Sequence, residues 1–270
     1  MKSRRQKAEG RSGVALVVAI FVTIPLFAQT HPITFDDMNA IRRIGAPQVS
    51  PDGKWIAYDA STADMGANKR TSAIYLVPSA GGESRKIADG DGPAWSPDGK
   101  TIAYGAGGQV NLYDIAAGMS RKASDLPGGA SKIKWVPDGS AVVATSDIYP
   151  QCGLDPACIK QVSAPNASSA RIITSLLYRH WKAWQAPTRS HILYVPLNGG
   201  SARDLTPGPF DAPPFSVGGG DEFEVSPDSK ELVFARNLSD HPEVSTNTDL
   251  YIVPLAGGDA KQITTRTGAD

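Results

Sequence analysis

The chain has 270 residues, of which 41% are hydrophobic, and its 27 basic and 27 acidic side chains give a formal charge of zero. This length can bury the core of one or two domains. The balanced charge offers no electrostatic argument for nucleic acid or an anionic membrane surface as a partner.

The first 28 residues have the pattern of a secretory signal. A basic stretch over residues 2–11 precedes an almost wholly apolar run from Val14 to Phe27, and Ala28 supplies a small residue at its end. The apolar run is short for a membrane-spanning helix, although an uncleaved amino-terminal anchor is the alternative. We therefore expect residues 1–28 to be a signal peptide and the protein to be periplasmic or secreted, with no membrane contact beyond that segment.

Four copies of one short phrase divide the rest of the chain, residues 29–270, into repeats. The phrase reads Ser-Pro-Asp-Gly-Lys or a close variant, and its prolines are Pro51, Pro97, Pro137 and Pro227. Successive prolines lie 46, 40 and 90 residues apart, and the last interval holds one ordinary unit plus an insertion. A period of about 40–45 residues is typical of a four-stranded propeller blade.

The fold class expected is therefore all-β, a partial β-propeller of about four four-stranded blades. The expected blades cover residues 45–90, 91–126, 130–209 and 221–265, and the third contains an insertion over 147–189. Consecutive apolar residues such as Ile102-Ala103-Tyr104 are typical of sheets that are buried on both faces.

Each copy of the phrase predicts a tight turn between two strands. Proline presets φ, aspartate bonds its own backbone, and glycine takes the positive φ that follows. Ser229 stands where the other three copies have glycine, so we expect strain at that position.

The insertion in the third blade carries the candidate functional residues. It contains both cysteines of the chain, Cys152 and Cys158. In an exported protein they favour a local disulfide, whereas a metal site would need more ligands than His180 and His191 nearby. Arg179, His180, Trp181 and Trp184 could face a substrate or gate access to it, and the alternative is an insertion whose aromatic side chains pack on the blade edge.

Other polar residues predict no chemistry. The histidines His31, His191 and His241 adjoin no evident nucleophile, and the pairs Asp36-Asp37 and Asp221-Glu222 are interpreted as solvated turn charge. Gly218-Gly219-Gly220 is followed by no lysine, which a phosphate loop needs. We expect no cofactor and no metal.

Taken together, the entry into the first blade at Ile44–Gly53, the blade phrase followed by Ile-Ala-Tyr, and the segment Leu177–His191 resemble the amino-terminal propeller of prolyl oligopeptidase (S9) family serine peptidases. The nearest branch is that of acylaminoacyl and dipeptidyl peptidases. The resemblance implies a propeller that restricts an exported peptidase to short peptides, with the chain's own carboxy-terminal α/β-hydrolase domain as its partner.

The catalytic part of that family is not found in this sequence. A G-x-S-x-G nucleophile elbow does not occur, and Gly129-Ala130-Ser131-Lys132-Ile133 ends in isoleucine where the last glycine is required. The chain alone is therefore expected to be inactive, and no catalytic residue is assigned. The alternatives are a stand-alone periplasmic propeller of the TolB type, used for protein–protein interaction, and a closed ring of four blades. An open array would expose the apolar face of its last unit, which predicts self-association.

Overall fold

A computed structural model describes residues 31–164, 170–173, 176, 178–180, 183–214 and 222–268. The predicted signal peptide, residues 1–28, lies outside the described residues. Within them the chain forms four four-stranded antiparallel sheets and one separate two-stranded hairpin.

The four sheets follow one another along the chain, and in each the strands pair in sequence order. Sheet 1 consists of β1 (Arg43–Val49), β2 (Trp55–Asp64), β3 (Lys69–Pro78) and β4 (Arg85–Asp89). Sheet 2 consists of β5 (Asp91–Trp95), β6 (Thr101–Ala106), β7 (Gln109–Asp114) and β8 (Met119–Lys122). Sheet 3 consists of β9 (Ser131–Trp135), β10 (Ala141–Ile148), β13 (Arg189–Pro196) and β14 (Arg203–Asp204). Sheet 4 consists of β15 (Phe223–Val225), β16 (Glu231–Arg236), β17 (Asp249–Pro254) and β18 (Lys261–Gln262).

The remaining elements are small. The hairpin pairs β11 (Arg179–His180) with β12 (Ala183–Trp184). The described residues also contain the helices α1 (Phe35–Ala40) and α2 (Pro156–Val162) and the 3-10 turn η1 (Pro242–Val244). None of the helices in this described part has the length and apolar character needed to span a membrane.

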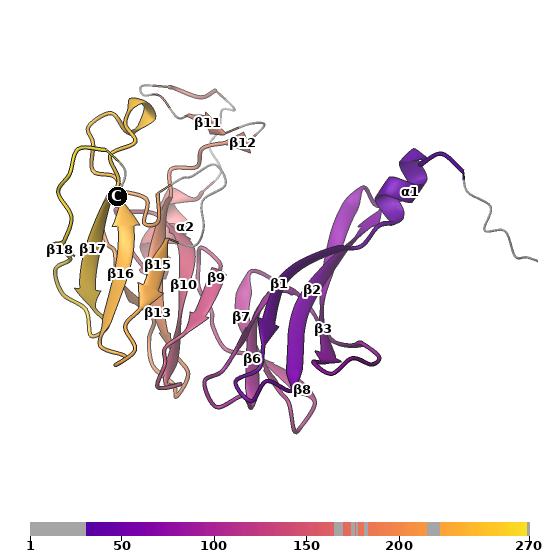
Figure 1. Ribbon diagram of the computed structural model, residues 1–270. Helices are drawn as coiled ribbons and strands as arrows, with labels where there is room; N and C mark the ends of the chain where they lie inside the picture. The colour runs from indigo at the N-terminus through magenta and orange to yellow at the C-terminus, as the bar shows by residue number, and fades with distance from the viewer. Residues whose placement is uncertain are drawn as a thin grey trace, which may run out of the picture.

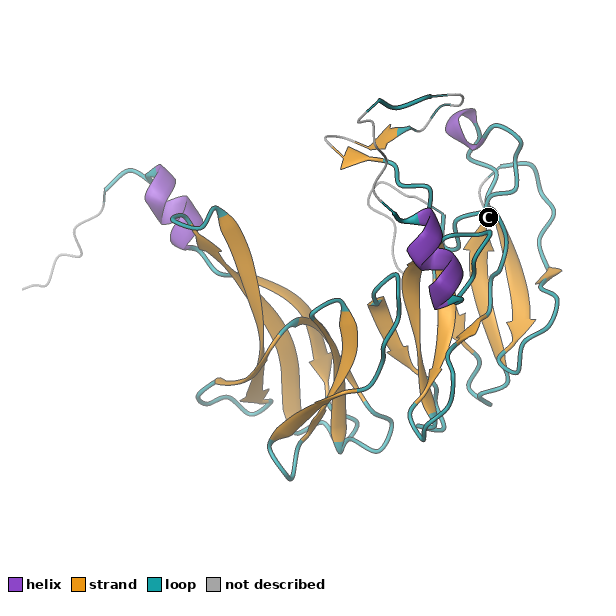
Figure 2. Ribbon diagram, turned by 180° about the vertical axis from the view of Figure 1, so that it is seen from behind, coloured by secondary structure: helices purple, strands orange, loops and turns teal. Residues whose placement is uncertain are grey.

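The sheets stand in a row that curves into an open arc. Sheet 1 and sheet 4 lie at opposite ends of this arc in both views, so the four sheets do not close on one another (Figures 1 and 2). The predicted all-β partial propeller is confirmed, and the alternative of a closed four-bladed ring is wrong.

Three buried cores, one between each pair of neighbouring sheets, hold the row together. Successive residues of a strand point to opposite faces of its sheet. We call the face toward the preceding sheet the leading face. The face toward the following sheet is the trailing face. Between sheets 1 and 2, Ala57 and Leu76 of a trailing face pack against Ile102 and Tyr104 of a leading face.

The other two cores repeat this rule. Ala103 and Leu112 of the trailing face of sheet 2 meet Val142 and Leu193 of sheet 3. Val143 of the trailing face of sheet 3 lies in one core with the leading-face residues of sheet 4, namely Leu232, Phe234, Tyr251 and Val253. Burial on both faces explains why the strands are apolar at consecutive positions.

Tryptophan side chains join the first strands of neighbouring sheets by hydrogen bonds. Trp95 Nε1 donates to the carbonyl of Gln48 at 3.1 Å, and Trp135 Nε1 donates to the carbonyl of Ala94 at 2.9 Å. The two bonds occupy equivalent positions in the repeat. Sheet 4 has Val225 at that position, and there Lys134 of sheet 3 reaches forward instead, donating to the Phe223 carbonyl at 2.8 Å.

We expect Trp135→Phe to lower the free energy of unfolding by about 1–2 kcal/mol, because it removes the indole donor and leaves the Ala94 carbonyl with one partner fewer in a half-buried seam. Urea denaturation followed by circular dichroism measures this change. Trp184→Phe is the matched control, because Trp184 is 48% exposed in the β11–β12 hairpin, and its effect should stay within about 0.5 kcal/mol. Equal effects of the two substitutions would contradict the role assigned to Trp135.

Candidate functional site

The phrase that marks each repeat forms a corner between the first two strands of a sheet. In sheet 2 the Ser96 hydroxyl donates to Asp98 Oδ1 at 2.7 Å and accepts from the Thr101 N–H at 2.9 Å. Asp98 Oδ1 also accepts from the Lys100 N–H at 3.1 Å. The corners of sheets 1 and 4 have the same serine–aspartate bond, between Ser50 and Asp52 and between Ser226 and Asp228.

The fourth residue of every corner has positive φ. Gly53, Gly99 and Gly139 have φ of 71°, 69° and 75°, and Ser229 has φ of 60° in the fourth corner. This is the conformation that favours glycine. The Ser229 hydroxyl accepts a hydrogen bond from the Asp138 N–H of the neighbouring corner at 3.0 Å, which offsets part of the backbone strain.

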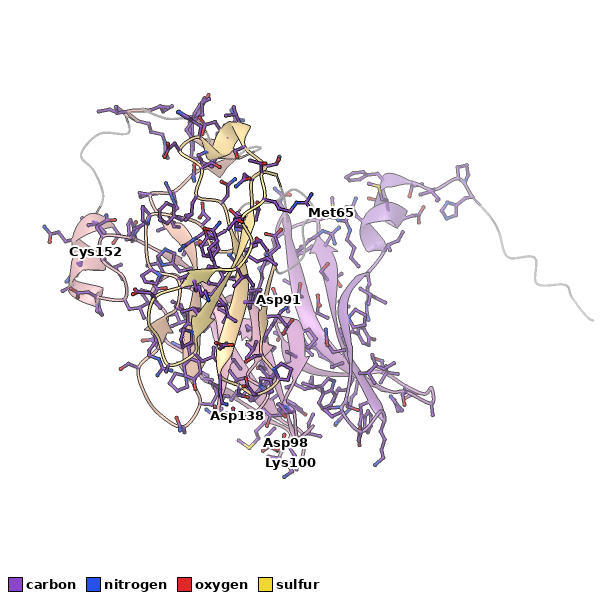
Figure 3. The ribbon with its side chains drawn as sticks, turned by 60° about the vertical axis from the view of Figure 1, so that its left-hand side comes forward. Met65, Asp91, Asp98, Lys100, Asp138 and Cys152 are labelled. Atoms are coloured by element: carbon purple, nitrogen blue, oxygen red, sulfur yellow. A yellow bond between two sulfur atoms is a disulfide. The ribbon has the colours of Figure 1, made fainter. Side chains whose placement is uncertain are left out.

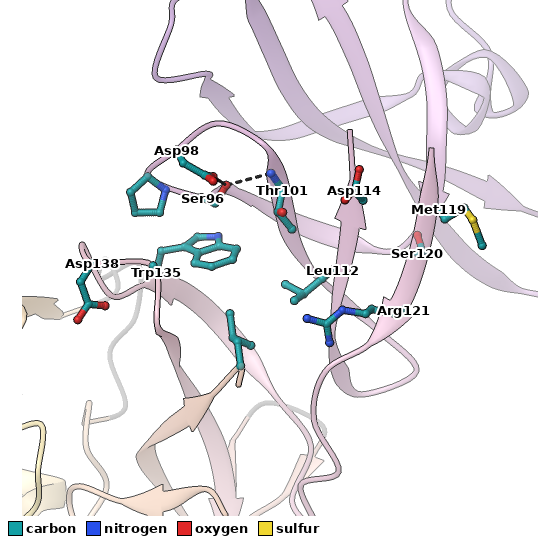
Figure 4. Close-up of a pocket in the computed structure, with 13 residues that line it drawn as sticks. Ser96, Asp98, Thr101, Leu112, Asp114, Met119, Ser120, Arg121, Trp135 and Asp138 are labelled. Atoms are coloured by element: carbon teal, nitrogen blue, oxygen red, sulfur yellow. Dashed lines mark hydrogen bonds between the residues drawn. The ribbon is translucent and has the colours of Figure 1, made fainter. Parts of the chain in front are cut away.

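A pocket of about 580 Å³ lies between the corners of sheets 2 and 3 (Figure 4). Elsewhere neighbouring corners touch. A Cβ atom on Gly99 would lie 3.5 Å from Pro51, and the corners of sheets 3 and 4 are joined by the bond to Ser229. A Cβ atom on Gly139 would have no neighbour within 4 Å among the described residues, which marks the place where the corners of sheets 2 and 3 stand apart.

Both apolar side chains and carboxylates line the pocket. Trp135, Leu112 and Leu197 line it together with Asp98, Asp114 and Asp138, and Arg121 extends from β8 into the same space (Figure 4). The Lys100 ammonium lies 3.8 Å from Asp98 Oδ2, so the three carboxylates face two cationic groups and the surroundings of the pocket are only slightly negative. Figure 3 shows Asp98, Lys100 and Asp138 together at this end of the molecule.

Hydrogen bonds keep the corner carboxylates ionised. The Ser96 hydroxyl and the Lys100 backbone N–H hold the pKa of Asp98 below its usual value. Bonds from the hydroxyl and the backbone N–H of Ser140 likewise lower the pKa of Asp138. These carboxylates therefore keep their negative charge down to a lower pH than an ordinary aspartate.

Two other carboxyl groups are shifted in the opposite direction. Burial, and then the charge of Asp59, raises the pKa of Asp91. Burial and the charge of Asp211 do the same for Asp147. Among the described residues no group of three or more histidine, cysteine, aspartate or glutamate side chains is arranged to hold a metal ion.

The insertion of sheet 3 lies away from this pocket. The β11–β12 hairpin projects above the sheets at the end opposite the corners (Figures 1 and 2). Cys152 and Cys158 form a disulfide with their Cα atoms 5.4 Å apart, and it ties α2 to the turn that follows β10. Asp155 caps α2 by accepting from the Ala157 N–H at 2.9 Å.

The candidate gating residues are only partly brought together. Arg179 pairs with Trp184 and His180 with Ala183 across the hairpin. The Trp184 ring lies 6.1 Å from that of Tyr178, and the guanidinium of Arg171 lies 4.9 Å above it. Trp181 lies outside the described residues, so its role stays a prediction, as do the roles of the other three.

A buried polar cluster in sheet 3 was not found from the sequence. His191 is 1% exposed, and its Nδ1 lies 2.7 Å from Asp204 Oδ2 while its Nε2 lies 2.9 Å from the Gly208 carbonyl. Asp204 and the Gly208 carbonyl thus hold the buried ring at its two nitrogen atoms. His191 and Asp204 lie thirteen positions apart, on β13 and β14. The pairing of these strands places Leu193 opposite Asp204 and so brings Asp204 near His191, which the sequence alone does not reveal.

This cluster resembles a catalytic triad in composition only. Ser146 stands opposite His191 in the β10–β13 register, and its hydroxyl has no hydrogen-bond partner among the residues that the structure describes. His191 Nε2, which would have to accept the serine proton, is occupied by the Gly208 carbonyl, and Ser146 is only 4% exposed. The cluster therefore anchors the loop around Gly208 to β13 and leaves no room for substrate.

Comparison with known proteins identifies peptidases as relatives. No protein-family model matches the chain. It is 28% identical over 284 residues to dipeptidyl-peptidase 5 of Porphyromonas endodontalis, covering 94% of this chain and 40% of that protein. It is 30% identical over 231 residues to the uncharacterized peptidase YuxL of Bacillus subtilis, covering 82% of this chain and 34% of that protein. The chain thus spans two fifths or less of the length of these relatives.

A solved structure shows the same fold. The acylaminoacyl peptidase of Pyrococcus horikoshii superposes with a TM-score of 0.61 at 14% identity, over 85% of this chain and 33% of that one. At this identity the match supports the fold alone, and the peptidase kinship comes from the sequence relatives. Both agree with the resemblance expected from the repeats.

We expect Ser96→Ala to lower the free energy of unfolding by about 1 kcal/mol at pH 7. The folded-state pKa of Asp98 is lowered, so the stability from its ionised form is present above the unfolded pKa and is lost as the pH falls. The difference between Ser96→Ala and the parent should therefore shrink toward pH 3, as measured by urea denaturation at each pH. Ser201→Ala, at an exposed serine, serves as control, and a pH-independent difference would contradict the assignment.

We expect His191→Ala to destabilise the chain by about 3 kcal/mol or more, because it removes a fully buried ring together with its bonds to Asp204 and to the Gly208 carbonyl. A double-mutant cycle with Asp204→Ala measures the pair directly, and the two losses should overlap by at least about 1 kcal/mol. Strictly additive losses would show that the residues do not act as a pair.

Proposed function

We propose, from the premise that this chain is an S9 peptidase-like propeller region, that it is the non-catalytic, substrate-gating part of an exported serine peptidase. The observation that carries the proposal is the combination of peptidase relatives with a sequence that contains no G-x-S-x-G elbow. Bond cleavage would belong to an α/β-hydrolase domain that acts together with the propeller, by acyl transfer to serine and without a cofactor. Peptides would be the substrates of the whole enzyme, and its place would be the periplasm or the exterior.

The geometry supports a gating role at the insertion. The β11–β12 hairpin stands clear of the sheets, and its Trp184 side chain is 48% exposed beside Tyr178 and Arg171. An exposed aromatic ring next to a guanidinium can contact peptide backbones and apolar side chains. The disulfide between Cys152 and Cys158 closes a short loop, six positions wide, at the start of the connection that carries the hairpin.

The relatives favour this proposal over a TolB-type binding module. The two described above both carry peptidase names, and the alignment covers 94% of this chain in the first of them. The role of Arg179, His180, Trp181 and Trp184 as gate residues is part of the proposal.

The isolated chain should not hydrolyse aminoacyl- or dipeptidyl-chromogenic substrates, because it supplies no serine nucleophile. A chromogenic assay with and without a serine-directed inhibitor measures this. Turnover that the inhibitor abolishes would overturn the proposal.

The gate assignment has a test of its own. Short peptides should bind the chain weakly, and Trp184→Ala should weaken that binding about 10-fold, equivalent to about 1.4 kcal/mol. Titration calorimetry measures the affinity, and Val244→Ala, at an 80% exposed side chain in η1, is the control. If both variants bind equally, the hairpin is not the gate, whereas the non-catalytic role would still stand.

A further inference from the structure

The fourth strand of every sheet carries a cation at the same position of the repeat. Each of these cations stands directly opposite a residue of the third strand, and the pairs are Leu76 with Arg85, Leu112 with Arg121, Tyr194 with Arg203, and Ile252 with Lys261. Directly opposed residues share a face. The three arginines therefore lie on the trailing faces of sheets 1, 2 and 3, one at each seam between neighbouring sheets.

In two of the three seams an aromatic ring lies beneath this arginine. Between sheets 1 and 2, the Arg85 guanidinium lies 5.8 Å from the centroid of the Trp55 ring. Between sheets 3 and 4, the Arg203 guanidinium lies 4.2 Å from the centroid of the Tyr194 ring. Both rings are half-buried and pack against the core of their seam. A ring under the guanidinium is thus the regular filling of this place.

The middle seam, between sheets 2 and 3, has the arginine without the ring. Thr101 stands where sheet 1 has Trp55, and Leu112 stands where sheet 3 has Tyr194. Among the described residues the side chain of Arg121 has no hydrogen bond, ion pair or aromatic partner. The pocket of about 580 Å³ occupies this place, and its volume is that of a small-molecule site.

The walls of the pocket suit a ring with a polar substituent. Trp135 lies across the pocket from Arg121 (Figure 4). It is the equivalent of Trp95, which packs in the same core as Trp55 in the first seam. Asp114 stands where sheets 1, 3 and 4 have proline. Its Oδ1 accepts from the Ala117 N–H at 2.7 Å, and the carboxylate can accept a further bond from a ligand hydroxyl or N–H.

We propose that this pocket binds a neutral aromatic ring that carries a hydrogen-bond donor, a phenol or an indole. The ring would take the place that Trp55 and Tyr194 fill in the neighbouring seams. Guanidinium groups are attracted to electron-rich rings, and the carboxylates of the lining disfavour an anionic ring. Both walls belong to sheets that are themselves flanked by sheets 1 and 4, so the pocket does not arise at an end of the arc (Figure 1). The proposal does not depend on the peptidase role.

The test uses p-cresol, an uncharged phenol, and its saturated counterpart 4-methylcyclohexanol, each titrated into the chain by calorimetry. p-Cresol should bind with a dissociation constant of about 1 mM or tighter. The saturated alcohol should bind at least about 3-fold more weakly, because it lacks the ring electrons that attract Arg121. The capped amino acid N-acetyl-tyrosinamide separates two sources of the ring. Binding equal to that of p-cresol supports a peptide side chain as the occupant, and weaker binding supports a free small molecule.

Two substitutions locate the binding at this pocket. Arg121→Met should weaken p-cresol binding about 5-fold, and Arg70→Met, at an exposed arginine of β3, should bind like the parent. Thr101→Trp places the chain's own ring where sheet 1 has Trp55, so it should abolish p-cresol binding and raise the melting temperature. If Thr101→Trp does not fold, Arg121→Met decides alone, because the Arg121 side chain is exposed.

Three results would overturn the proposal. The first is a parent chain that does not bind p-cresol at about 10 mM. The second is equal binding of p-cresol and 4-methylcyclohexanol, which would show an apolar hollow without preference for a ring. The third is p-cresol binding that Arg121→Met leaves unchanged, which would place the ring elsewhere. Trp184→Ala in the β11–β12 hairpin should leave p-cresol binding unchanged, so this site and the gate are tested separately.

Discussion

The structure depends on how side chains alternate along each strand. One set of alternate residues faces the preceding sheet and the other faces the following sheet, so every strand in the middle of the row must be apolar on both sides. Ala103 and Ile102, next to each other in β6, belong to two different cores and are both fully buried. A polar substitution at either position would disturb one specific seam and leave the other intact. The row is therefore a series of nearest-neighbour contacts.

Hydrogen bonds set the spacing that these apolar contacts need. The corner serine and aspartate fix the turn between the first two strands of sheets 1, 2 and 4, and the tryptophans tie the inner strands of sheets 1, 2 and 3. Sheet 3 has Val136 in place of the corner serine, and its Asp138 is bonded by Ser140 instead. The pocket lies at this variant corner, where the regular contact between neighbouring corners is absent.

Most of the fold could be predicted from the sequence because each sheet is built from strands that follow one another along the chain. The repeated phrase located the turns, and the positive φ expected at Ser229 is present at 60°. The pocket and the His191–Asp204 pair could not be predicted, because both depend on which residues of different strands become neighbours. From the sequence His191 is interpreted as a structural histidine. The residues next to it in the chain do not indicate that Asp204 and the Gly208 carbonyl bind its ring. The hydrogen bonds of Trp95 and Trp135 could not be predicted either, because each joins two neighbouring sheets.

The long connection in sheet 3 has a consequence for how the chain reaches this structure. The strands β10 and β13 pair along eight residues each, yet the connection between them runs from Ile148 to Arg189, about ten times the length of that between β2 and β3. Closing so long a loop costs about 2 kcal/mol more in chain entropy. We therefore expect sheet 3 to assemble more slowly than sheets 1 and 2, and the Cys152–Cys158 bond shortens its long loop only slightly. The strands of sheets 1 and 2 are joined by short connections and need no such closure.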